Sequence, residues 1–156
     1  MTERGIADVL SIAFMSIILI VGSAIMHAYS LRPLQAATAR QLELKCEHLY
    51  GMLETSWVEP YSIGILKAAA EQIVLESPTV PDRYLRSYVT ATLDHLRPPG
   101  YGVIVILSQS GKTWALTCPE NAHETDEQFL ARGQLSITKA GGEVVTLSVE
   151  VKLFKV

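Results

Sequence analysis

The chain has 156 residues, of which 49% are hydrophobic and 19% are charged. Thirteen Lys and Arg stand against 16 Asp and Glu, a net charge of −3, which excludes a basic nucleic-acid-binding protein and an acidic disordered segment. The two cysteines exclude a disulfide-dense miniprotein.

The first feature along the chain is an apolar segment. Residues 6–31 carry a single carboxylate, Asp8, and no Lys or Arg. Within them, the uncharged stretch Val9–Met26 would extend about 27 Å as a helix, close to the thickness of a bilayer core. We therefore expect a long hydrophobic N-terminal helix that spans a membrane. A buried core helix and a cleaved secretory signal, with small residues at Gly22, Ser23 and Ala24, are the alternatives.

Beyond Arg32 the charge balance is that of an ordinary globular domain. Pro33 is expected to bend or restart the helix. An amphipathic helix should then follow and end at Glu59–Pro60. Its inner stripe has apolar residues at steps of three and four: Leu42, Cys46, Leu49, Leu53 and Trp57.

Two further helices are predicted. One runs from Ser62, as its N-cap, to Glu76, and the other runs from Asp82 to Leu96. The sequence Pro98–Gly100 ends the second of them.

The rest of the chain has the patterns of strands. The apolar run 101–107 predicts a central strand covered on both faces, and 112–117 should return beside it. Residues 130–139 and 145–153 alternate between apolar and polar side chains around the turn at Gly141–Gly142. The predicted fold class is α+β, with a helical segment followed by a four-stranded antiparallel meander.

The two cysteines are candidates for a disulfide. Cys46 lies on the inner helical stripe, and Cys118 ends a strand expected beneath that helix. A Cys46–Cys118 bridge would stabilise the fold by about 4 kcal/mol in the chain-entropy model if the compartment is oxidising. Two small buried thiols are the alternative.

The sequence contains no clear motif for catalysis, metal binding or phosphate binding. The four histidines form no metal-ligand spacing, and the acidic loop 118–128 lacks the pattern of a calcium loop. The sequence SQSGK at 108–112 lacks the first glycine of a phosphate-binding loop and is followed by a strand pattern. We expect no enzyme, no cofactor and no metal site. Tyr84, Tyr88 and Tyr101 could line a partner surface or lie at the edge of the core.

A short motif precedes the apolar segment: Arg4–Gly5 stands directly before Ile6–Leu10. This arrangement resembles the class III signal peptide of the type IV pilin-like family, in particular archaeal pilins and pseudopilins. The resemblance implies that a prepilin peptidase cleaves between Gly5 and Ile6. It also implies a leader (1–5), a transmembrane and assembly helix (6–31), and an extracytoplasmic head (32–156).

In such a subunit the helix that remains after cleavage mediates assembly. Asp8 would favour the start of the helix and pair with the terminal amine of a neighbour. Gly22, Ser23 and Ala24 would let helices approach closely. The expected function is a structural subunit of a pilus-like filament or pseudopilus at the cell surface. Its partners are membrane lipid, copies of itself or related subunits, and the peptidase, with no nucleic acid. The alternative is a single-span membrane protein whose extracytoplasmic α+β domain binds a ligand or partner.

Overall fold

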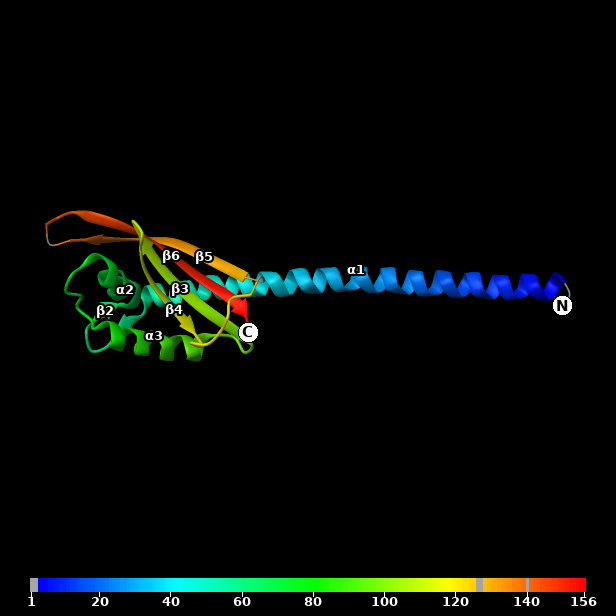
Figure 1. The fold of residues 1–156 in the computed structure, drawn as a ribbon, viewed down its shortest axis with the longest axis horizontal. Helices are drawn as coiled ribbons and strands as arrows, with labels where there is room; N and C mark the ends of the chain where they lie inside the picture. Colours follow the sequence, from blue (N-terminus) through cyan, green and yellow to red (C-terminus); the bar gives the residue numbers. More distant parts are fainter. Residues whose placement is uncertain (1–2, 126–127, 140) are drawn as a thin grey trace. The chain divides into compact units, whose positions relative to one another are not determined.

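A computed structural model gives the fold (Figure 1). It describes the backbone of residues 3–125, 128–139 and 141–156, and the side chains of these residues except 3–13 and 27–36. The chain divides into two compact units, Met1–Gln41 and Leu42–Val156. The domain boundaries expected at 5/6 and 31/32 stay predictions.

The first element is one helix, α1 (Glu3–Thr55), of 53 residues. It continues through Pro33, so the bend or restart expected there is wrong. A proline removes only one N–H donor, and the residues after it, such as Leu34, Gln35 and Ala36, are strong helix formers. The helix also ends earlier than expected, at Thr55 rather than at Glu59.

The expected transmembrane helix is not supported. Among the residues whose side chains the structure describes, no helix is apolar over a long enough stretch to cross a membrane. Residues 6–31 are not a separate apolar helix, because they belong to α1, which goes on into the charged sequence after Arg40. These findings correct the transmembrane helix in the predicted fold and the membrane-anchored location, while the α+β class itself is unaffected.

The second unit contains two more helices. Helix α2 (Ile65–Val74) follows Gly64, and helix α3 (Asp82–Leu96) has the bounds that the sequence predicts. Ser62 does not cap α2, because it adopts a φ of 52° within the preceding turn. Helix α3 buries one face, which consists of Leu85, Val89 and Leu93. Helix α2 is buried around most of its circumference, through Ile65, Leu66, Ala68, Ala69, Ala70, Glu71 and Ile73.

The strands form two antiparallel sheets, so the fold is α+β. A small sheet pairs β1 (Trp57–Val58) with β2 (Ile63–Gly64). The larger sheet contains β3 (Tyr101–Gln109), β4 (Lys112–Cys118), β5 (Gln128–Thr138) and β6 (Val144–Lys155).

The order of the larger sheet is β4-β3-β6-β5, so the predicted meander is wrong. A meander would place β5 beside β4, but β6 lies between β3 and β5 and pairs with both. The two inner strands, β3 and β6, are the most apolar of the four. The central position of β3 is confirmed by the burial of Val103, Ile104 and Val105.

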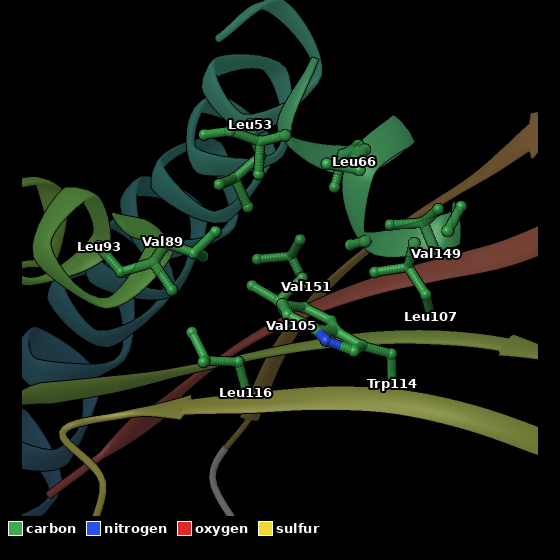
Figure 2. Close-up of a cluster of buried hydrophobic side chains, with 14 of the residues drawn as sticks. Leu53, Leu66, Val89, Leu93, Val105, Leu107, Trp114, Leu116, Val149 and Val151 are labelled. Atoms are coloured by element: carbon green, nitrogen blue, oxygen red, sulfur yellow. The ribbon is translucent and has the colours of Figure 1, made fainter. Parts of the chain in front are cut away.

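The core of the second unit lies between the sheet and the helices (Figure 2). Leu53, Leu66, Val89 and Leu93 reach it from the helices. The strands supply the opposite side of this cluster, with Val105, Leu107, Trp114, Leu116, Val149 and Val151. The inner stripe of α1 is confirmed from Leu42 to Leu53. Trp57 is 61% exposed, because the helix ends before it.

Candidate functional site

The residues expected to mediate assembly lie on a part of α1 that is exposed in the single chain. Nine large apolar side chains between residues 14 and 26 are more than half exposed: Phe14, Met15, Ile17, Ile18, Leu19, Ile20, Val21, Ile25 and Met26. Gly22, Ser23 and Ala24 are exposed as well. A Cβ atom added at Gly22 would meet nothing within 4 Å. We call the surface of residues 14–26 the assembly segment.

The apolar side chains point to almost every side of this helix. Successive residues of an α-helix are turned by about 100°, so Ile18, Leu19 and Ile20 face three different directions. The polar residues Ser16 and Ser23 are seven apart and therefore share one side. The assembly segment is thus apolar around most of its circumference, unlike an amphipathic helix that packs one face on a core.

The remaining predicted residues near the N-terminus are not tested. The backbone at Gly5, Ile6 and Asp8 belongs to α1, but the side chains of these residues lie outside those that the structure describes. Cleavage between Gly5 and Ile6 and the pairing of Asp8 stay predictions.

The predicted disulfide is wrong, because both cysteines are free and buried. The Sγ of Cys46 donates to the carbonyls of Val151 and Phe129, at 3.1 and 3.4 Å. The Sγ of Cys118 instead lies 3.8 Å from the carbonyl of Thr90 on α3. Each thiol therefore faces its own backbone acceptors on different elements.

Burial also keeps these thiols protonated. It is the largest effect on the pKa of Cys46 and of Cys118, and both pKa values are raised. For Cys118 the charge of Arg97 acts in the opposite direction but does not outweigh burial. Protonated buried thiols are poor nucleophiles, so the two cysteines behave as small core residues.

The acidic loop before β5 makes contacts with the end of β6. Glu124 lies 2.8 Å from the Nζ of Lys152, and the hydroxyl of Thr125 donates to the carbonyl of Lys155. Asp126 and Glu127 lie outside the described residues. In the part of the chain that the structure describes, no group of three or more His, Cys, Asp and Glu side chains gathers as metal ligands would.

Two of the three tyrosines singled out in the sequence, Tyr84 and Tyr88, hold the β1–β2 hairpin against α3. The hydroxyl of Tyr88 donates to the carbonyl of Trp57 over 2.9 Å, and that of Tyr84 donates to the carbonyl of Glu59. The ring of Tyr84 also contacts Tyr61, with centroids 5.4 Å apart. Their hydroxyl groups thus have structural partners.

One polar cluster was not predicted. Asp82, at the start of α3, accepts hydrogen bonds of 2.8 Å from the indole of Trp114 and from the guanidinium of Arg86. Arg86 also donates to the carbonyl of Ala115 and lies over the ring of Trp114, 5.2 Å from its centroid. This cluster fixes α3 to β4. Only the i,i+4 pair of Asp82 and Arg86 is visible in the sequence.

The surface of the second unit also has hollows. One of about 410 Å³ lies beside the β3–β4 turn and is lined by Ser108, Gln109, Ser110, Gly111, Gln134, Thr146, Leu147 and Ser148. This lining contains no ionisable side chain. The Ser108 and Ser148 hydroxyls lie 2.7 Å apart and form a hydrogen bond with each other. A second hollow, of about 420 Å³, lies between the end of α2 and β4.

Comparison of the chain with protein-family models, with curated proteins and with solved structures finds no match in any of the three. The resemblance to pilin-like proteins therefore depends on the residues around Gly5 and on the apolar segment that follows.

Proposed function

We propose that this protein is a structural subunit of a pilus-like filament or pseudopilus, in which copies associate through the assembly segment of α1. The single observation that carries the proposal is the exposure of the nine large apolar side chains between Phe14 and Met26. Contiguous apolar surfaces of this kind in proteins mark sites of interaction.

The size of the hydrophobic effect supports association. Full burial of a Leu, Ile, Phe, Met or Val side chain contributes about 1.5–3 kcal/mol. Nine such side chains would contribute on the order of 14–27 kcal/mol as an upper limit, compared with an association cost of about 4–15 kcal/mol. Burial of this segment is therefore large enough to hold copies together.

The arrangement around the helix supports many copies rather than two. One neighbouring helix covers only one side of another, and Ile18, Leu19 and Ile20 point to three sides. A helix in the interior of a filament has neighbours on every side, whereas a helix in a dimer leaves most of its apolar surface exposed. The geometry thus favours a multi-copy bundle.

Processing belongs to the same proposal. Removal of residues 1–5 would leave Ile6 as the first residue, two positions before Asp8. The mass of the protein purified from its source measures this directly, and an intact Met1 would contradict the processing step. The alternative of a membrane-anchored binding protein is not carried forward, because it needed the membrane span.

The proposal is tested by placing one charge on each of three sides of the assembly segment. We expect Ile18→Glu, Leu19→Glu and Ile20→Glu, made singly, each to raise the concentration needed for assembly at least tenfold, because each buries a carboxylate between apolar neighbours. Light scattering and electron microscopy of the full chain measure the assembly.

Leu44→Glu is the matched control. Leu44 is 55% exposed on the same helix but lies outside the assembly segment, so this change should leave assembly unaltered. If only one of the three Glu substitutions weakened assembly, the helix would have a neighbour on one side only. That result would indicate a dimer and contradict the filament. A wild-type chain that stays monomeric at high concentration, or that is monomeric and binds lipid vesicles instead, would also contradict it.

A further inference from the structure

Strand β5 is an outer strand of the larger sheet. In the order β4-β3-β6-β5, β5 pairs with β6 along all 11 of its residues, and no strand among the described residues pairs with its other edge. Figure 1 shows β5 at the border of the sheet, beside β6. An outer strand of this length presents a row of backbone donors and acceptors to any strand that approaches it.

The register identifies which residues of β5 face outward. The N–H of Lys139 donates to the carbonyl of Glu143 over 2.8 Å, directly beyond the pair Thr138–Val144. Hydrogen-bonded and non-bonded pairs alternate in an antiparallel ladder, so the odd-numbered residues of β5 bond to β6. The even-numbered residues, which include Arg132, Gln134 and Ser136, direct their N–H and C=O groups to the open edge.

At the opposite edge of the sheet one backbone acceptor is occupied, whereas among the described residues no hydrogen bond reaches the outer edge of β5. On β4, Arg86 of α3 donates to the carbonyl of Ala115 over 2.8 Å and so occupies an edge acceptor. On β5 there is no proline, and the single charged residue, Arg132, is paired with Glu150 of β6 at 2.9 Å. Lysine and proline are the usual means of preventing strand addition at an edge.

We propose that β5 pairs antiparallel with β5 of a second copy of this chain, so that the two sheets become continuous. The recognising chemistry is the open backbone edge, which an extended strand alone can satisfy in full. In the pairing centred on Gln134, even-numbered residues face even-numbered residues. Each such pair exchanges two hydrogen bonds. Leu130, which is 39% exposed, gains an apolar contact opposite Thr138 of the other copy.

Charge selects this register. Centred on Gln134, Arg132 lies opposite Ser136 of the other copy, and the two Arg132 positions are about 14 Å apart along the strands. That separation exceeds the Debye length of about 8 Å at physiological ionic strength. A register centred on Arg132 would place two like charges directly opposite each other, which is destabilising.

This contact is independent of the assembly segment, and the experiment separates the two. The full chain with Leu19→Glu is designed to lack helix-mediated assembly. We expect it to form dimers in light scattering. Adding Leu130→Lys and Ser136→Lys should raise the dissociation constant of that dimer at least tenfold. Thr113→Lys, at an exposed position of β4, is the matched control and should leave it unchanged.

Amide hydrogen exchange gives a second readout. In the dimer, the amides of Arg132, Gln134 and Ser136 should be protected, and the Leu130→Lys/Ser136→Lys chain should exchange them at least tenfold faster. The odd-numbered amides of β5 are internal standards, because β6 protects them in both forms. If circular dichroism shows that the double lysine chain is unfolded, Gln134→Pro replaces it and removes one outward N–H.

A Leu19→Glu chain that is monomeric, or whose even-numbered β5 amides exchange freely, would overturn the β5 pairing and leave the filament proposal intact. A dimer that the edge substitutions do not weaken would overturn it too. Continued assembly of the Leu19→Glu chain would contradict the filament proposal, while exchange at the even-numbered amides still decides the β5 pairing.

Discussion

At the scale of single residues, Asp82 shows how opposing effects set a pKa. Partial burial is the largest effect and raises the pKa of Asp82. The hydrogen bonds from Arg86 and Trp114 and the charge of Arg86 together lower it more, so its pKa lies below the ordinary value of 3.8. The ionised form of Asp82 is therefore favoured in the folded protein.

The pH dependence of stability follows from this direction. Because the folded pKa is lower than the unfolded one, the stabilisation is fully present above the unfolded pKa and is lost as pH falls through the folded pKa. We expect Asp82→Asn to lower the free energy of unfolding by about 0.5–1 kcal/mol at pH 7, a small effect because the carboxylate is 47% exposed. The difference should shrink as the pH falls below the ordinary value of 3.8 and through the lower folded pKa. Urea unfolding of both chains across this range measures it, and a difference that persists or grows in acid would contradict it.

Another residue-scale constraint joins α1 to β5. The ring of Tyr50 lies over Gly133, and a Cβ atom added there would overlap the Tyr50 ring. We expect Gly133→Ala to lower the free energy of unfolding by about 1–3 kcal/mol, because the ring must move. Denaturant unfolding measures the change.

The control for this prediction is Gly51→Ala, one residue after Tyr50. An added Cβ at Gly51 meets nothing within 4 Å, and alanine favours helix over glycine by about 1 kcal/mol. Gly51→Ala should therefore stabilise the protein. If Gly133→Ala left the free energy of unfolding unchanged, or lowered it just as much in a chain that also carries Tyr50→Leu, contact with the Tyr50 ring would not constrain the fold.

At the scale of elements, local sequence patterns predicted the individual helices and strands whose buried sides repeat at a regular spacing. The alternation of Val145, Leu147, Val149 and Val151 with polar residues identifies β6, and the apolar spacing of Leu85, Val89 and Leu93 identifies α3. Each pattern reports which side of an element is buried, and burial depends little on which element covers it.

The pairing of elements could not be predicted in the same way. The sequence does not distinguish a sheet in which β5 lies beside β4 from one in which β5 lies beside β6 at the far edge. Both arrangements bury the same side chains. The contact between Asp82 and Trp114 spans 32 residues, and the packing of the Tyr50 ring over Gly133 links α1 to β5. The disulfide prediction failed for this reason: both cysteines are buried as expected, but Cys46 lies against β5 and β6, whereas Cys118 lies against α3.

At the scale of the whole molecule, the described apolar residues include a buried set and an exposed set. The buried cluster is drawn from Leu42 to Leu153, and the assembly segment contributes no member to it among the described residues. In the proposed filament, the same chain thus uses one set of apolar residues to fold and another to associate.

This separation predicts that assembly can be removed without loss of the fold. We expect Leu19→Glu to change the free energy of unfolding of the second unit by less than about 0.5 kcal/mol, because Leu19 is 72% exposed and outside the core. Leu53→Ala, at a position that is 0% exposed, should lower it by about 2–5 kcal/mol. Both tryptophans, Trp57 and Trp114, lie in the second unit, so their fluorescence during urea unfolding measures that unit alone. If Leu19→Glu destabilised the protein as strongly as Leu53→Ala, residue 19 would be part of the folding core. The exposed apolar surface would then no longer be available for association with other copies.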